Sequence, residues 1–303
     1  MDNSDSNHSS SPVFQKKLLH LTQKRLEKFA SLFPRVLISD HPDPIHDTRV
    51  WSRRLQQVFS FLFPKPRTAK SRKLVRVLRR VRRALGDCRN LDVSIDLIQE
   101  KIDTVHNPSV RAAWEQIRED VQEKRTGELT QARKELTQYD IIAFLTRMQE
   151  LLQAVESDRN PEDTLKESID QALEDWHNAL SSAKDNQETD ALHRLRIAGK
   201  RLRYRLELIA ELGENSAKEK VKTLKAFQDQ LGAWHDRTVL LQLVADFIGR
   251  QDFLVSHPEM ARALLLEMDK ERRKNEAAVA NILKSAEKIR ESWSVPVPDA
   301  TKA

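Results

Sequence analysis

The sequence of 303 residues is poor in cysteine and glycine and has no long apolar run, and each of these absences excludes a class of protein. Its single cysteine, Cys88, can form no intrachain disulfide and supplies neither a zinc cluster nor a redox pair, so we expect a small core residue. Six glycines fall far below the usual frequency of about 7%, which leaves little room for glycine turns and hairpins. No apolar run approaches the roughly 18 residues that indicate a membrane-spanning helix. The sequence therefore predicts a soluble helical protein with no membrane partner.

The pattern of apolar residues supports this prediction. Apolar positions recur at i, i+3 or i+4 and i+7 through nearly the whole chain, which is typical of an all-α fold. Proline after asparagine at 107–108 and 160–161 indicates helix starts. We expect the polar segments 1–11 and 291–303 to be flexible tails. Because the opening MDNSDSNHSS lacks the basic and apolar regions of a secretory signal, we expect a cytoplasmic protein.

Two motifs occur twice, in the same order. HDTRVWSRRL at 46–55 matches HRLRIAGKRL at 193–202, an offset of 147 residues. LGDCRNLDV at 85–93 matches LGAWHDRTV at 231–239, an offset of 146. This order predicts a duplicated helical unit in which each repeat forms a small bundle.

We expect a first repeat over about 12–157 and a second over about 160–290. Gly86 and Gly232 within the second motif predict helix ends or close helix crossings. Asn90 and Asp236 would then lie early in the following helices.

Positive charge is concentrated in the segment 48–86, which contains thirteen Lys and Arg and no Asp or Glu. Since the whole chain carries +6, the remainder carries −7. The sequence therefore predicts a mildly acidic body with one strongly basic helical hairpin.

Helical geometry places these cations on narrow faces opposite apolar residues, because successive residues are rotated by about 100°. Four such faces are predicted, two in each repeat: Arg72, Arg76, Arg79 and Arg83; His46, Arg49 and Arg53; His193, Arg196, Lys200 and Arg203; and Lys218, Lys222 and Lys225. In the basic hairpin no carboxylate is interleaved to relieve the repulsion between cations. A polyanion is the natural partner, and its affinity should fall steeply with salt.

Several side chains near these faces have two interpretations. His46 and His193 either donate to a phosphate oxygen, with nearby arginine favouring the neutral imidazole, or bond a neighbouring loop. Arg89 is suited to an anion near a helix start, although its counterpart His235 weakens the symmetry. Tyr204 either adds a hydroxyl to the basic face or lies at the edge of the core.

The sequence contains no glycine-rich phosphate loop, GxSxG or HExxH motif. No carboxylate or second histidine stands at ligand spacing on the basic faces, so we expect neither a metal site nor a cofactor. The residues favour binding over catalysis.

The paired segments HDTRVWSRRL and LHRLRIAGKRLRY, with LGDCRNLDV and LGAWHD, resemble the CHAD family, the conserved histidine α-helical domain. The resemblance covers about residues 12–290. It implies two antiparallel four-helix bundles related by pseudo-twofold symmetry, with a basic groove or pore between them that binds inorganic polyphosphate. It also implies association of stand-alone members with cytoplasmic polyphosphate granules.

The resemblance implies ligands on both His-led helices and on the helices that follow them, and the charge pattern adds Lys73, Arg89 and Tyr204. The candidate ligands are His46, Arg49, Arg53, Arg54, Arg72, Lys73, Arg76, Arg79, Arg80, Arg83, Arg89, His193, Arg196, Lys200, Arg201, Arg203, Tyr204, Lys218, Lys222 and Lys225.

Two departures from the family pattern matter. Asn90 stands where the family commonly has Asp after Arg, so an ion pair near a helix terminus is expected to be missing. Asp229 occupies the position equivalent to Arg83, which weakens the second repeat. We expect tighter phosphate contacts from the first repeat.

Two other functions stay open. The same cations would attract DNA, RNA or other polyanions nonspecifically, although few aromatics are interleaved for stacking on single strands and no helix-turn-helix is evident. A metal-dependent polyphosphate phosphatase would need acidic ligands, and the basic segment contains none.

Overall fold

The structure, a computed structural model, describes residues 12–63, 68–155, 160–186 and 188–294. Throughout these residues the secondary structure is helical and contains no strand, as predicted. The expected N-terminal tail lies outside the described residues. Of the expected C-terminal tail, residues 291–294 form the last turn of a helix and the rest lies outside the described residues.

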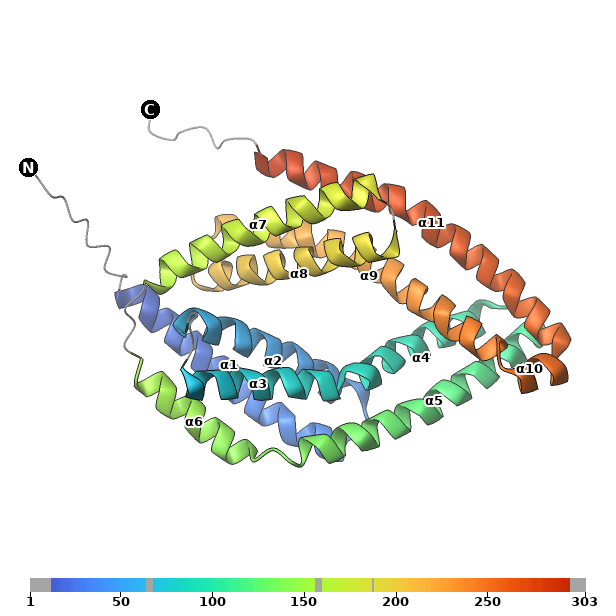
Figure 1. Ribbon diagram of the computed structural model, residues 1–303, viewed down its shortest axis with the longest axis horizontal. Helices are drawn as coiled ribbons and strands as arrows, with labels where there is room; N and C mark the ends of the chain where they lie inside the picture. Colours follow the sequence, from blue (N-terminus) through green and yellow to red (C-terminus); the bar gives the residue numbers. More distant parts are fainter. Residues whose placement is uncertain (1–11, 64–67, 156–159, 187, 295–303) are drawn as a thin grey trace, which may run out of the picture. The chain divides into compact units, whose positions relative to one another are not determined.

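The chain divides into two compact units (Figure 1). The first unit comprises the chain up to Thr104 together with Trp114–Glu167, and the second comprises Val105–Ala113 together with the chain from Ser168. The first contains all or most of α1 (Pro12–Ile38), α2 (Pro42–Leu62), α3 (Ala69–Ala84), α4 (Gly86–Thr104), α5 (Pro108–Leu136) and α6 (Ile141–Gln153). The second contains all or most of α7 (Pro161–Asp185), α8 (Thr189–Glu211), α9 (Ser216–Ile248), α10 (Gln251–Ser256) and α11 (Pro258–Ser294).

The predicted helix starts are confirmed, and polar side chains satisfy the open backbone N–H groups there. Asn107 Oδ1 accepts from the Ser109 N–H at 2.9 Å before α5, and Asn160 Oδ1 accepts from the Glu162 N–H at 2.9 Å before α7. The N-cap of α3 is Thr68, whose side chain accepts from the Ser71 N–H. Local sequence thus fixes where the basic helix begins.

Each unit has its own apolar core. In the first unit Phe29 packs against Phe33 and, across to α6, against Phe144, both at 5.9 Å between ring centroids. In the second unit Trp176 of α7 meets Phe227 of α9 edge-on at 6.2 Å. These buried aromatics hold the helices that carry the cationic faces.

The element bounds follow the offset between the repeats. Shifting α2 by 147 residues gives 189–209, close to the bounds of α8. Shifting α3 and α4 together by 146 gives 215–250, which the single helix α9 occupies. The repeat boundaries and the pseudo-twofold symmetry stay predictions.

The two glycines of the repeated motif behave differently. The helix end predicted at Gly86 is confirmed, because α3 ends at Ala84, Leu85 is its C-cap and α4 begins at Gly86. The prediction for Gly232 is wrong, since that residue lies inside the continuous helix α9 and a Cβ there would meet nothing within 4 Å. Asp236 is therefore also inside a helix.

Candidate functional site

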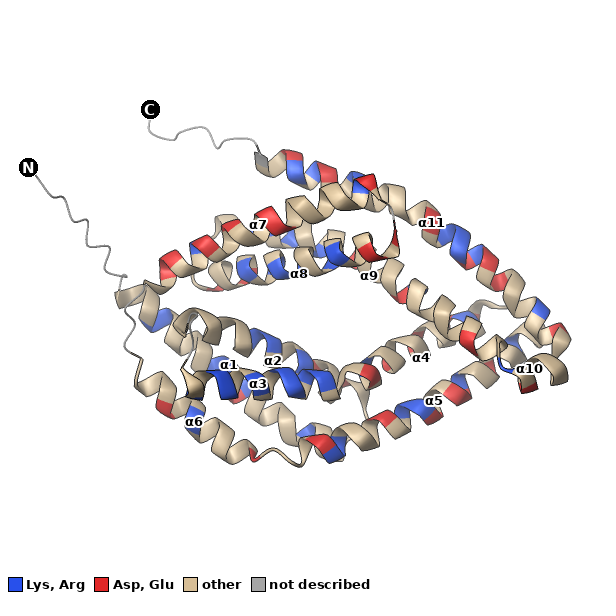
Figure 2. Ribbon diagram, viewed as in Figure 1, with Lys and Arg blue, Asp and Glu red and all other residues tan. Residues whose placement is uncertain are grey.

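The side of α3 that faces away from the core carries Arg72, Arg76, Arg79 and Arg83, which we name the α3 face. All four side chains are exposed. The opposite side of the helix is buried through Leu74, Leu78 and Val81. Lys73 and Arg80 flank the α3 face and are also exposed. Figure 2 shows lysine and arginine along α3 without an acidic residue among them.

The six exposed cations of the α3 face and its flanks have no counter-ion within the described part of the chain. None of them lies within 4.0 Å of a carboxylate belonging to the described residues. Cations at i and i+4 repel each other, and a solvated helix normally relieves this with interleaved carboxylates. The charge of this surface is therefore not compensated by the described residues.

Helix α2 contributes a face that is only partly exposed. The Arg49 guanidinium is half-buried and donates from Nη1 to the carbonyl oxygen of Arg82, at the end of α3. Burial, with the charges of Arg53 and Arg89, lowers the pKa of Arg49. Arg53 is half-buried as well. Arg49 thus fastens α2 to α3 while it keeps its charge near the α3 face.

Two other α2 residues were predicted as ligands. His46 is exposed at the start of the helix, and burial of part of the ring, followed by the charge of Arg89, lowers its pKa, so the imidazole is neutral at pH 7. The Arg54 guanidinium lies 5.1 Å from the centroid of the Trp51 ring. A stacked, half-buried Arg54 contributes less to an exposed cationic surface than the α3 face does.

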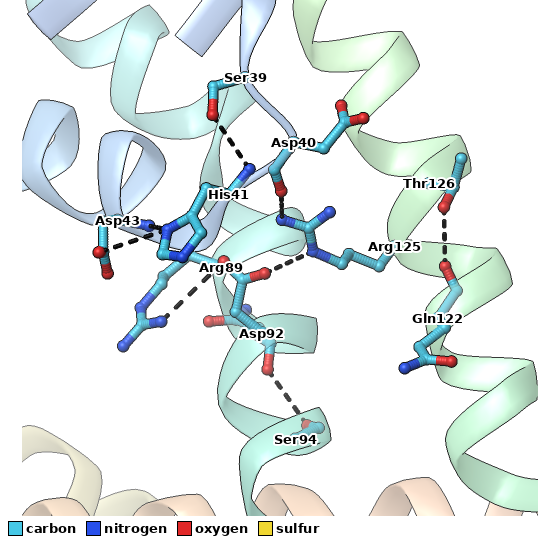
Figure 3. A network of polar contacts seen from close by, with 11 residues as sticks. Ser39, Asp40, His41, Asp43, Arg89, Asp92, Ser94, Gln122, Arg125 and Thr126 are labelled. Carbon is cyan, nitrogen blue, oxygen red and sulfur yellow. Dashed lines mark hydrogen bonds and ion pairs between the residues drawn. The ribbon is translucent and has the colours of Figure 1, made fainter. Parts of the chain in front are cut away.

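The first unit also contains a buried ion pair between α4 and α5 that local sequence pattern does not reveal (Figure 3). Asp92 of α4 is buried, and its Oδ1 accepts from Arg125 Nε at 2.6 Å. Arg125 also donates from Nη2 to the carbonyl oxygen of Asp40 at 2.6 Å. Although burial opposes it, the hydrogen bond with Asp92 raises the pKa of Arg125. The pair ties α4 and α5 to the link between α1 and α2.

Asp92 also forms an ion pair with Arg89. Arg89 Nη1 lies 4.0 Å from Asp92 Oδ2, so the carboxylate that was expected to be missing at Asn90 is supplied two residues further along. Cys88 beside them is fully buried, as expected, and burial raises the pKa of its thiol to about 11. The cysteine is therefore a protonated core residue rather than a reactive one.

In the second unit α8 and α9 bring two histidines together. His193 of α8 and His235 of α9 have ring centroids 5.5 Å apart. Burial, followed by the charges of Arg196, His193 and Lys200, lowers the pKa of His235 to about 4. Arg196 and Lys200 are half-buried beside them. In the sequence His235 is the counterpart of Arg89 in the second repeat. That equivalence is the signal that could have predicted a place for His235 beside the basic residues of α8.

Further along α8, acidic and amide groups compensate the cations. Arg203 donates from Nε to Gln228 Oε1 at 2.7 Å and from Nη1 to Glu207, and its guanidinium lies 4.7 Å from the Tyr204 ring centroid. Arg201 lies 3.9 Å from the carboxylate of Asp175. The second unit therefore presents less uncompensated charge than the sequence of α8 indicates.

The cations of α9 are exposed. Lys218, Lys222 and Lys225 form no ion pair within 4.0 Å with a carboxylate of the described residues. Acidic Glu219 and Asp229 stand on the same helix. The α9 lysines resemble the α3 face in exposure but carry weaker, point-like donors.

Two further properties bear on the chemistry. No cluster of three or more His, Cys, Asp or Glu side chains that would suit a metal ion occurs in the described ranges. Among the helices in those ranges, none is long and apolar enough to cross a membrane.

Comparison with known proteins shows which family the sequence matches. The model of the CHAD domain family matches residues 20–245. The crystal structure of the CHAD domain from the plant Ricinus communis is similar, with a TM-score of 0.64 and 20% sequence identity over 89% of this chain and 91% of that chain. At this identity the structural likeness shows the all-α fold. No curated protein matches the sequence.

Proposed function

The chain belongs to the CHAD family, and on that premise we propose that it binds inorganic polyphosphate through the cationic surfaces of α2 and α3 in the first unit and of α8 and α9 in the second. The observation that carries the proposal is the α3 face with its flanks, which bears six exposed cations and no carboxylate partner among the described residues. A linear polyanion matches such a repeating row of charge better than a single phosphate does.

The chemistry of the side chains supports phosphate as the ligand. Arginine guanidinium groups form paired, charge-assisted hydrogen bonds to phosphate oxygens, and five of the six exposed cations of the α3 face and its flanks are arginines. Binding displaces condensed counterions, which supplies affinity without sequence or base recognition. The predicted basic groove between the repeats stays a prediction.

We propose further that the protein has no catalytic activity toward polyphosphate and acts in localising or organising it, including at granules. Hydrolysis needs an activated water, and the cationic surfaces carry no cluster of carboxylates among the described residues that would hold a metal for that purpose. Incubation of polyphosphate with Mg²⁺ or Mn²⁺ should release no phosphate. Release that depends on the α3 face would contradict a purely binding role.

The decisive experiment measures affinity for long-chain polyphosphate across a salt series, with duplex DNA and heparin as competitors. The test variant is Arg72→Ala/Arg76→Ala/Arg79→Ala. The matched control is Arg262→Ala/Lys284→Ala/Lys288→Ala, which removes three exposed cations from α11 and so produces the same change in net charge.

We expect polyphosphate to be preferred over both competitors and the α3 variant alone to lose binding, with a shallower salt dependence. Equal binding of all three polyanions would indicate a generic cationic surface. Equal losses in both variants would show that net charge, rather than the α3 face, determines affinity.

A further inference from the structure

A second feature of α3 points to another ligand. A cavity of about 600 Å³ lies within the first unit, between α3, α6 and the turn that joins α5 to α6. On α3 it is lined at i, i+3, i+4 and i+7, by Lys70, Lys73, Leu74 and Val77. This is a different side of the helix from the α3 face. Lys73 thus stands between the two, since it flanks the α3 face and also lines this cavity.

The floor of the cavity is apolar. Leu74 and Phe144 are 4% and 3% exposed and line it, with Val77 and Leu151 on the two helix walls. A polyphosphate chain is charged along its whole length and would lose hydration against such a floor without gaining contacts. The cavity thus selects a ligand with an apolar part.

The rim of the cavity is cationic. Lys70 and Lys73 stand on the α3 wall and Arg147 on the α6 wall, and none has an ion pair with a carboxylate in the described parts of the chain. Two carboxylates also line the cavity, but Asp140 is engaged as the N-cap of α6, where its Oδ1 accepts from a backbone N–H at 2.8 Å. Glu150 is the other. The three cations of the lining therefore outnumber its two acids.

A neutral donor completes the lining. Tyr139 is half-buried, and its hydroxyl makes no hydrogen bond with the described residues. The Tyr139 hydroxyl can therefore donate a hydrogen bond to a ligand, and its ring adds an aromatic surface to the lining.

We propose that this cavity binds a small organic anion, with its aromatic or aliphatic body on Leu74, Val77 and Phe144 and its acidic group between the cations of α3 and α6. The volume falls within the range of about 300–1,000 Å³ typical of small-molecule sites, and a few polar groups around an apolar floor are the usual composition of such sites. Apart from Lys73, the lining of the cavity is separate from the polyphosphate surface, and the proposal does not depend on that assignment.

The test uses 8-anilinonaphthalene-1-sulfonate as the probe, because it combines an aromatic body with one anionic group. Fluorescence titration of the full chain should show saturable binding of one equivalent. Lys70→Gln/Arg147→Gln removes an exposed cation from each wall and should weaken the probe by at least about tenfold. Val77→Trp should fill the cavity and abolish binding.

The matched control is Arg76→Gln/Arg79→Gln, which removes the same charge from the α3 face. It should lose polyphosphate affinity and keep the probe, whereas Lys70→Gln/Arg147→Gln and Val77→Trp should keep polyphosphate. Undiminished probe binding in both cavity variants would overturn the proposal, as would displacement of the probe by polyphosphate in the unmodified protein. Failure of polyphosphate binding with probe binding intact would overturn only the proposed function.

Discussion

Helix α3 of the first unit carries eight lysines and arginines and helix α8 of the second carries six, but the acids near the two helices are placed differently. The arginines of the α3 face are exposed and have no carboxylate partner among the described residues, while Asp92 of the neighbouring helix α4 is buried. On α8 the acids stand at the cationic surface itself, where Glu207 pairs with Arg203. In the first unit the carboxylate of Asp92 holds helices together, and in the second the carboxylate of Glu207 neutralises Arg203, a predicted ligand.

This difference shows that the position of acidic residues, rather than the number of basic ones, decides what charge a helix offers to a ligand. A buried ion pair fixes helices, and a surface pair consumes charge. The following predictions test the comparison.

The largest effect should come from Asp92→Ala. It leaves the largely buried Arg125 without its carboxylate, and breaking a buried pair typically costs about 3–5 kcal/mol. Asp175→Ala in the second unit removes the carboxylate 3.9 Å from exposed Arg201 and should cost less than about 1 kcal/mol. The free energies of unfolding come from urea titrations followed by circular dichroism. Similar values for the two variants would remove the distinction between the units.

A smaller contrast is expected in binding. Arg72→Ala/Arg76→Ala/Arg79→Ala should lower polyphosphate affinity by about a hundredfold, at roughly 1 kcal/mol for each guanidinium. Lys218→Ala/Lys222→Ala/Lys225→Ala should lower it by about tenfold or less, because lysine binds as a point charge and acids share its helix. Titrations at several salt concentrations check this. A greater loss from the α9 variant would reverse the expected order of the two units.

Polyphosphate affinity should rise severalfold as the pH falls below about 6.5. The pKa values of His46 and His235 are lowered in the unbound protein, that of His235 to about 4, so both rings are neutral at pH 7. A bound polyanion favours the imidazolium, so binding takes up protons and strengthens as the pH falls. Without ligand the sign is opposite for stability: the unfolded chain holds these protons more tightly, so the free energy of unfolding falls as the pH falls from about 6.5 toward 4.

The pH effect is checked by titrations from pH 7.5 to 5.5. His46→Gln/His235→Gln should remove the increase while preserving most of the affinity at pH 7.5. An unchanged pH profile in this variant would assign the effect to other groups.

The smallest effect is expected for Glu207→Gln. This change removes the charge that compensates Arg203 and should raise polyphosphate affinity about twofold to threefold. Glu174→Gln on α7 makes the same change in net charge at an exposed position and should leave the affinity unaltered. The two variants are compared by competition titration. Equal gains would indicate a long-range charge effect rather than release of Arg203.

The sequence predicted those parts of the fold that depend on local pattern. The helix starts at Pro108 and Pro161 and the apolar back of α3 follow from capping residues and periodicity, which neighbouring elements do not alter. The interpretation of Gly232 failed because a glycine inside a helix costs only about 1 kcal/mol, which packing along the 33-residue α9 can offset.

The candidate site was predictable to a similar extent. Exposure of the arginines at 72, 76, 79 and 83 followed from the spacing of charge. The partners of Arg203 and Arg125 did not, since Gln228 and Asp92 lie 25 and 33 residues away and reach them only through packing between helices. The cavity beside Lys73 likewise depends on how α6 lies against α3.

The break between α3 and α4 has an electrostatic consequence. The C-terminus of a helix carries a partial negative charge from its open carbonyl groups, which would repel a polyanion lying along α3. Arg49 bonds one of those carbonyls, at Arg82, and offsets that charge. Directly beyond, α4 begins at Gly86 with the opposite, positive end of its dipole, and its first turn carries both Asp87 and Arg89. Helix α9 is unbroken and has no such pair of ends in its interior. The partial charge of the backbone therefore changes from negative to positive between α3 and α4, and no such change occurs within α9.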